Sequence, residues 1–202
     1  MIQAISKSLT LEQFIADYGD NDRYELIDGE LIDRSPTGPH EEVAAFLLRK
    51  FNVEIDRLNV RWFTPTRCLI KPLGQSTAFR PDVLILDKEA IANEPLWQQE
   101  PIITLPSSIK LVAEVVISNW QNDYARKVED YAALGIPEYW VVDYLGVGGR
   151  QFIGVAKPPT ITIHQLVEGE YQGQQFRGSD LIISPTFPNL ELTAEQVFAA
   201  AR

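Results

Sequence analysis

Apolar residues recur at helical spacing in three stretches of the sequence. In residues 40–58 they stand at positions 43, 44, 47, 48, 51, 55 and 58, which places them on one stripe of a helix. Acidic residues in its first turn suit the helix dipole. Residues 9–18 predict a shorter amphipathic helix that begins near Thr10. Residues 120–134 predict a third helix, which ends at Gly135 because glycine readily adopts the left-handed conformation that closes a helix.

Alternating or continuous apolar runs predict the strands. Residues 24–32 contain two alternating segments around Asp28-Gly29, a pair that favours a hairpin turn because both residues tolerate a positive φ. The apolar runs at 83–86, 111–117 and 138–143 are typical of strands covered on both faces of a sheet.

Other segments give weaker signals. We expect strand-like structure at about 60–71, three or four short strands between 149 and 183, and a polar loop with several prolines at 88–108. A last helix is expected to begin at Thr193, since Gln196 completes a capping box. The order helix, hairpin, helix, strands, helix, strands predicts an α+β fold with a mixed central β-sheet flanked by helices.

Length and composition narrow the class of protein. A chain of 202 residues with 45% hydrophobic residues is consistent with a single domain over 1–202. Its apolar runs are shorter than the roughly 20 residues that a membrane-spanning helix needs, and its first residues lack the apolar segment of a secretory signal. The single Cys68 cannot form an internal disulfide, which agrees with a reducing compartment. We therefore expect a cytoplasmic protein without a membrane segment.

The net charge of −10 argues against a protein that coats nucleic acid, because such proteins normally have a basic surface. It does not exclude a nuclease, since a site built from carboxylates is acidic until it holds a divalent ion. Positive charge is concentrated between positions 49 and 71, in a segment that is either a solvated helix face followed by a strand or a patch that grips phosphate. The residues of this basic segment are Arg49, Lys50, Arg57, Arg61, Arg67 and Lys71.

Two acidic residues occupy unusual positions. Glu114 is the one charged residue in the run LVAEVVI, and a buried carboxylate needs a cationic partner or a metal. Asp82 follows Pro81, which cannot donate to a strand ladder, so we expect Asp82 at the first paired position of its strand. Carboxylates on neighbouring strands suit a hard ion such as Mg²⁺, and the backbone carbonyl of Val115 would add a third oxygen. A buried ion pair is the alternative explanation of Glu114.

Lys127 lies in the helix expected at 120–134. Asp123, Lys127 and Tyr131 share one stripe of that helix, at spacings of four residues. The spacing alone favours a surface ion pair between Lys127 and Asp123, worth about 0.5 kcal/mol or less. Tyr131 is expected to pack in the core.

Three segments together carry a family resemblance. RPDV at 80–83, AEVVIS at 113–118 and DYARKVEDYAALGIPEYWVVD at 123–143 resemble the Uma family of restriction-endonuclease-like proteins, within the PD-(D/E)XK nuclease superfamily. YELIDGELI at 24–32 is similar to the opening segment of that family. The resemblance covers about residues 10–200, and its most specific part is the block ending in GIPEYWVVD. It implies a restriction-endonuclease-like core.

The resemblance assigns roles residue by residue. It matches the Pro-Asp of the superfamily to Pro81-Asp82 and its acidic strand residue to Glu114. Val116 replaces the lysine expected two residues after the acid, whereas Lys127 matches the lysine that Uma-type proteins carry on the next helix. The resemblance implies that Asp82 and Glu114 hold Mg²⁺ or Mn²⁺, which polarises the scissile phosphate and activates a water. It implies that Lys127 orients that water or stabilises the developing charge.

Glu30 and His40 are further candidates for catalytic roles. Glu30 could face the site from the hairpin, or it could be a solvent-facing hairpin residue. His40 could point inward from the head of its helix, or it could be an ordinary residue beside the helix start. The sequence leaves both alternatives open for each residue.

Three functions compete at this stage. The leading hypothesis is an endonuclease that cleaves DNA, and a homodimer is expected because superfamily members often pair to cut two strands. The second is a catalytically silent protein of nuclease fold that serves as a nucleic-acid or protein interaction module, since a fold does not guarantee an activity. The third is a metal-dependent hydrolase of another phosphate ester. The sequence has no G-x-S-x-G motif, zinc-type Cys/His spacing, P-loop or Rossmann fingerprint to support other chemistry.

Overall fold

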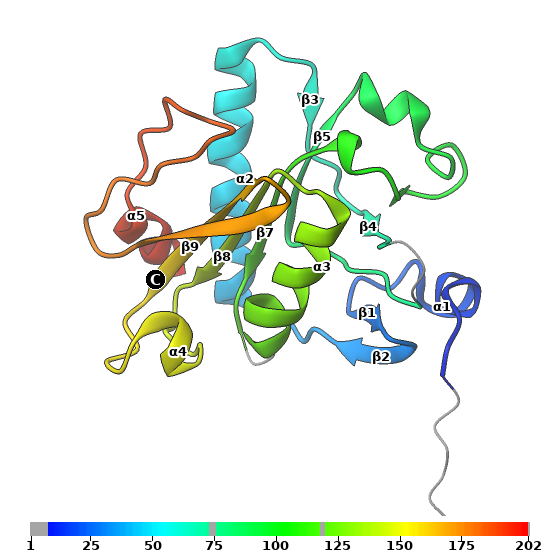
Figure 1. Ribbon diagram of the computed structural model, residues 1–202, viewed down its shortest axis with the longest axis horizontal. Helices are drawn as coiled ribbons and strands as arrows, with labels where there is room; N and C mark the ends of the chain where they lie inside the picture. Colours follow the sequence, from blue (N-terminus) through cyan, green and yellow to red (C-terminus); the bar gives the residue numbers. More distant parts are fainter. Residues whose placement is uncertain (1–7, 73–75, 118–119, 202) are drawn as a thin grey trace, which may run out of the picture.

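A mixed β-sheet forms the centre of the protein. The computed structural model describes residues 8–72, 76–117 and 120–201 (Figure 1). The strands of the central sheet, in spatial order, are β10 (Glu170–Phe176), β9 (Thr160–Val167), β8 (Glu138–Asp143), β7 (Ile109–Val115), β5 (Val83–Asp87) and β3 (Trp62–Phe63). β7 and β8 run parallel, and the other neighbouring strands are antiparallel. The α+β prediction of a mixed sheet flanked by helices is confirmed.

Helices cover both faces of this sheet. The long helix α2 (Gly38–Leu58) packs behind the sheet in Figure 1. The ring of Phe51 on this helix meets that of Trp140 of β8 edge to face, with the ring centres 5.1 Å apart. The opposite face is covered by a π-helical turn, η3 (Asn122–Arg126), which runs directly into α3 (Lys127–Leu134). Successive side chains of a strand point to opposite faces. Val115 therefore packs with α2, whereas Glu114 faces α3.

The N-terminal elements form as the local signals predict. α1 (Leu11–Tyr18) begins after Thr10, whose side chain completes a capping box. β1 (Tyr24–Ile27) and β2 (Glu30–Asp33) form the antiparallel hairpin, and Asp28 and Gly29 have φ values of 51° and 81°. An antiparallel bridge from Leu26 to Ala78 joins the hairpin to the segment that leads into β5.

The segment 60–71 is divided between two sheets. β3 joins the central sheet, whereas β4 (Leu69–Ile70) pairs in parallel with β6 (Ile102–Ile103) in a small separate sheet. Pro65 lies between β3 and β4 and cannot donate to a ladder, which explains the break. β6 lies in the segment 88–108 that was predicted to be a loop. This segment also contains two 3-10 turns, η1 (Ala90–Asn93) and η2 (Pro106–Ser108).

The prediction of three or four short strands between 149 and 183 is wrong. This stretch contains the helical turn α4 (Arg150–Ile153) and two longer strands, β9 and β10. Gly173 does not break β10, because it pairs with His164 of β9, and a Cβ added at Gly173 would lie 3.2 Å from the His164 ring.

The C-terminal helix confirms its predicted start. α5 (Ala194–Phe198) begins after Thr193 with the capping box to Gln196, and η4 (Ala199–Ala201) follows it. Across the described ranges, no helix is both long enough and apolar enough to cross a membrane.

Candidate active site

Asp82 stands at the entrance of β5, at the end of the sheet. It lies one residue before the first paired position, where Val83 is opposite Ala113, so the prediction that Asp82 itself is paired is wrong. The side chain takes the place of a ladder contact, because its Oδ2 accepts a hydrogen bond from the backbone N–H of Val115 at 2.7 Å. This bond fixes the carboxylate against the end of β7.

Two cationic side chains contact the same carboxylate. The Arg34 guanidinium donates to Oδ1 of Asp82, and Nε2 of His40 lies 3.2 Å from Oδ2. Burial favours the neutral form of Asp82, but Arg34 and His40 outweigh it and hold the pKa of this carboxyl below its usual value. Burial also disfavours charge on His40, yet the hydrogen bond to Asp82 leaves its pKa raised. The inward orientation considered for His40 is therefore confirmed.

Glu114 has a cation and a hydroxyl on one of its oxygens. Nζ of Lys127 lies 3.0 Å from Oε1 of Glu114, and the Tyr131 hydroxyl donates to the same atom at 3.1 Å. The Glu114 side chain is 2% exposed. Burial raises the pKa of Glu114 to about 8 although Lys127 opposes the shift. Tyr131 packs in the core as expected, and it also fixes the position of the carboxylate.

Lys127 is bonded to two further acids. Its Nζ lies 3.1 Å from Oδ1 of Asp123 and 3.4 Å from Oε2 of Glu25. The pairing with Asp123 was expected at the surface, but Lys127 is 3% exposed, because this stripe of the helix packs against the sheet. Burial opposes charge on Lys127, and the neighbouring carboxylates, led by Glu114, nonetheless hold its pKa well above the ordinary value. Burial raises the pKa of Asp123 to about 6.

These residues surround one small cavity, where β5 begins and the antiparallel β7 ends. Its volume of about 30 Å³ is enough for one or two water molecules or a single ion. Asp82, directly before β5, and Glu114 of the neighbouring strand β7 both line this space. The lining residues are Glu25, Arg34, Pro36, His40, Asp82, Glu114, Val115, Ile117, Asp123 and Lys127.

The hairpin contributes a different acid from the one expected. Glu30 is exposed at the start of β2 and lies outside the residues that line the cavity, so the alternative of a solvent-facing hairpin residue is the one that the structure supports. Glu25 of β1 is buried and takes that place. Side chains two apart in a strand share a face, and Glu25 therefore points the same way as the buried Ile27. The two-residue alternation of side chains in this strand could therefore have identified Glu25 from the sequence.

Arg34 is the contributor that sequence reasoning missed altogether. It follows directly after β2, and its guanidinium also donates to the backbone carbonyl of Asp22 at 3.1 Å. Burial disfavours its charged form, but the carboxylates of Asp82, Glu114 and Glu25 outweigh this and raise its pKa. Its proximity to Asp82 arises from tertiary packing across 48 residues of sequence.

The carboxylates of this cluster are chemically suitable ligands for a divalent ion, but their oxygens already contact cationic side chains of the chain itself. Carboxylates such as those of Asp82 and Glu114 are the ligands that a hard ion prefers. Within residues 8–72, 76–117 and 120–201, no group of three or more His, Cys, Asp or Glu side chains is arranged to hold a metal ion. Arg34 and Lys127 contact the carboxylates that such an ion would use. An ion bound between Asp82 and Glu114 would therefore compete with these two cations.

Comparison with known proteins identifies the family of the chain. The Uma2 family model, described as "Putative restriction endonuclease", matches residues 11–195. The chain belongs to the Uma2 family. The Uma2 chain is also similar to a crystal structure described as a "putative nuclease belonging to DUF820" from Anabaena variabilis ATCC 29413, with a TM-score of 0.70 and 17% identity. That match covers 96% of this chain and 99% of the other, and at this identity it shows a shared fold. Among curated proteins, the comparison finds no significant match.

Proposed function

We propose that this Uma2 protein is an endodeoxyribonuclease that hydrolyses phosphodiester bonds with Mg²⁺ or Mn²⁺ held by Asp82 and Glu114. The observation that carries the proposal is the convergence of these two carboxylates on one cavity, with the Lys127 ammonium 3.0 Å from Glu114. Family membership supports a nuclease, since the family description names a restriction endonuclease. A divalent ion on these oxygens would polarise the scissile phosphate and lower the pKa of a bound water.

Lys127 supplies a fixed positive charge in this proposal. Its ammonium group is bonded to Glu114, Asp123 and Glu25 and lies 5.8 Å from the centre of the Phe79 ring. A buried charge that is already oriented stabilises negative charge on phosphorus without reorganising when the reaction occurs. The three acids are needed to keep Lys127 protonated in a buried position.

His40 and Tyr131 act as positioning residues. His40 and the Val115 N–H fix one oxygen of Asp82, while Tyr131 fixes one oxygen of Glu114. Side chains that hold the ligating carboxylates set their direction and basicity. Substitution of either positioning residue is therefore expected to weaken metal binding more than it changes the fold.

A cleavage assay tests the proposal. Purified protein is incubated with plasmid, linear duplex and single-stranded DNA in Mn²⁺, beside Asp82→Asn, Glu114→Gln and the matched control Glu30→Gln. We expect cleavage by the wild type and by the Glu30 variant, and a loss of at least about 100-fold in the other two, as for other single residues that stabilise a transition state. Cleavage that survives both Asp82→Asn and Glu114→Gln would place the activity elsewhere.

One observation favours a second candidate, a catalytically silent module that binds nucleic acid or protein. Arg34, Lys127 and His40 neutralise the carboxylates from within the chain. Thermal unfolding with and without Mn²⁺ separates the candidates, because an ion bound only by the folded state raises Tm by mass action. The homodimer remains a prediction, and sedimentation equilibrium tests it.

A further inference from the structure

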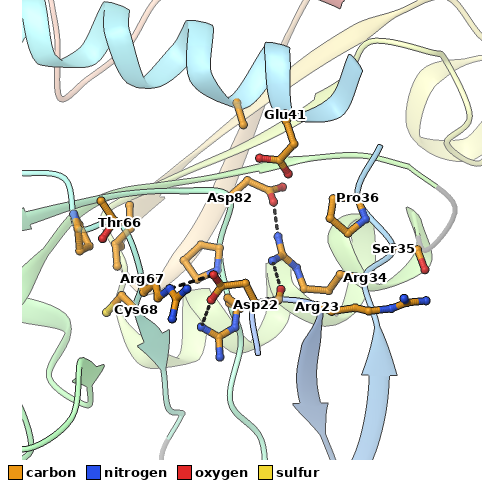
Figure 2. A pocket seen from close by; sticks show the side chains of 15 residues that line it. Asp22, Arg23, Arg34, Ser35, Pro36, Glu41, Thr66, Arg67, Cys68 and Asp82 are labelled. Carbon is orange, nitrogen blue, oxygen red and sulfur yellow. Dashed lines mark hydrogen bonds and ion pairs between the residues drawn. The ribbon is translucent and has the colours of Figure 1, made fainter. Parts of the chain in front are cut away.

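A second, larger cavity of about 540 Å³ adjoins the candidate active site. The two cavities share Arg34, Pro36 and Asp82 as lining residues. Figure 2 shows the Arg34 side chain reaching the carboxylate of Asp82 among the residues that line the larger cavity. A molecule that fills the larger cavity therefore lies directly beside the cluster of carboxylates. We call this space the arginine pocket, because Arg23, Arg34, Arg67 and Arg80 line it.

The arginines outnumber the acids in this pocket. Its acidic lining residues are Asp22, Glu41 and Asp82, so four arginines face three acids, although Arg23 is also paired with Asp33 outside the lining at 2.7 Å. Arg80 is 5% exposed and has a structural task, since it bonds the carbonyls of Gly19 and Tyr24.

Two of the four arginines are exposed, and of these Arg23 is held by both oxygens of Asp33, which leaves Arg67 better placed to meet a ligand. Its side chain is 55% exposed, and it pairs with the half-exposed carboxylate of Asp22 at 3.1 Å (Figure 2). Asp22 also accepts a hydrogen bond from Arg80, so it stays paired if Arg67 turns to another anion. An exposed pair of this kind is worth about 1 kcal/mol or less, and a phosphate can exchange for it at little cost.

The rest of the basic segment does not reach this pocket. Arg49 and Lys50 lie over the ring of Phe46 on α2, and Arg57 pairs with Glu54 one helical turn away. For these residues the interpretation as a helix face is confirmed. Arg67 is the member of the segment that lines the arginine pocket.

The rest of the pocket wall is mostly apolar, with the hydroxyl-bearing side chains of Ser35 and Thr66 beside it. Ala44, Pro65, Pro81 and Leu84 contribute to it. Cys68 also lines the pocket, but burial raises the pKa of its thiol to about 12, which removes it as a nucleophile near neutral pH. The pocket therefore offers charge and shape for binding.

We propose that the arginine pocket binds the phosphodiester backbone of a nucleic-acid strand beside the bond to be cut, with Arg67 and Arg34 as its phosphate ligands. The proposal rests on the proposed function, because it treats the two cavities as one substrate-binding surface. Arginine suits this role since its planar fork donates two parallel hydrogen bonds to phosphate oxygens. Arg34 lines both cavities and so connects the bound backbone to Asp82.

Binding without metal tests the pocket separately from the chemistry. Fluorescence anisotropy of a labelled 20-nucleotide single strand and a 20-base-pair duplex is measured in EDTA over a range of salt concentrations. The variants are Arg67→Gln, the charge-keeping Arg67→Lys, and Arg61→Gln as a matched control. Arg61 belongs to the same basic segment, pairs with Glu89 at the surface and lies outside the pocket.

We expect Arg67→Gln to weaken binding about tenfold at low salt, the order of one charge-assisted hydrogen bond. The slope of log K against log salt should fall in magnitude by about 0.7–0.9, the loss of one phosphate contact. Arg67→Lys should keep that slope, and Arg61→Gln should stay within about twofold of wild type in affinity. Equal affinities of the Arg67→Gln and Arg61→Gln variants would overturn the proposal.

Inorganic phosphate distinguishes a strand from a small anion. If phosphate raises the Tm of wild type but not of Arg67→Gln while DNA binding is unchanged, the pocket holds a free anion and the backbone proposal is wrong. The two proposals fail separately. If Arg67→Gln binds DNA as well as wild type and wild type cleaves DNA, only the proposal for the arginine pocket is rejected. If Arg67→Gln binds DNA more weakly but wild type does not cleave it, only the nuclease proposal is rejected.

Discussion

Replacement of Lys127 by methionine removes the cation that the buried acids share. Methionine keeps most of the side-chain volume, so the change is mainly one of charge. Glu114, Asp123 and Glu25 lose contacts of 3.0, 3.1 and 3.4 Å to Nζ. Removing one partner of a buried ion pair costs about 3–5 kcal/mol, because the other charge is left without compensation. Protonation of Glu114, whose pKa is already about 8, keeps the cost from growing further.

Thermal unfolding followed by circular dichroism measures this effect. For a chain of this size about 1 kcal/mol shifts Tm by 2–4 °C, so we expect Lys127→Met to lower Tm by about 6–20 °C near pH 8. The matched control is Lys110→Met, since Lys110 makes a partly exposed pair with Asp87 at 3.0 Å. This control should lose about 1 kcal/mol or less.

The loss of stability caused by Lys127→Met, relative to wild type, should also depend on pH. Burial raises the folded-state pKa of Glu114 to about 8 and of Asp123 to about 6, and without Lys127 both rise further. Acids with raised folded-state pKa values stabilise the fold below their unfolded pKa and lose that contribution as pH rises. The loss of stability relative to wild type should therefore grow as pH rises above about 6, where wild-type Asp123 ionises, and grow further above about pH 8, where wild-type Glu114 ionises. A deficit no larger than that of Lys110→Met, or one that shrinks as pH rises, would refute the buried-cation explanation.

Three further changes have defined outcomes. Arg34→Met should lower Tm without metal and increase the Tm gain from saturating Mn²⁺, since Asp82 loses the guanidinium that competes with an ion; an equal or smaller gain would contradict this competition. Burial lowers the pKa of His164 to about 4, so the fold loses stability as pH falls from about 6.5 to 4. Urea unfolding at pH 7 and pH 4 measures how much free energy of unfolding is lost on acidification. His164→Phe should make this loss about 3 kcal/mol smaller, and an unchanged loss would contradict the role of His164. Gly29→Ala should cost more free energy of unfolding than Gly169→Ala. Both glycines have positive φ, but a Cβ at Gly29 would also collide with the segment before α1, and equal costs would exclude that collision.

Elements with local signals could be predicted from the sequence. The Asp28-Gly29 turn and the capping box at Thr193 depend on residues within a few positions of each other, and both formed as expected. The assignment of β3 and β4 to different sheets could not be predicted, because it depends on β5 and β6, which come later in the chain.

The same distinction applies to the candidate site. Asp82 and Glu114 were identifiable because a lone carboxylate beside a buried strand must have a compensating partner. The resemblance, and not the helical spacing, indicated Lys127. Arg34 gave no local signal, since its contact with Asp82 arises when the hairpin packs against the end of the sheet. Tertiary contacts therefore supply the cation that sequence patterns do not reveal.

The claim that Asp82 and Glu114 together hold one divalent ion is tested most directly by calorimetric titration with Mn²⁺. Wild type and Glu30→Gln should each bind one ion per chain. Asp82→Asn and Glu114→Gln should bind it more weakly by at least about 10–100-fold, the loss that substitution of a residue supporting a ligand already causes. Equal Mn²⁺ binding by all four proteins, or no binding by the wild type, would contradict the claim.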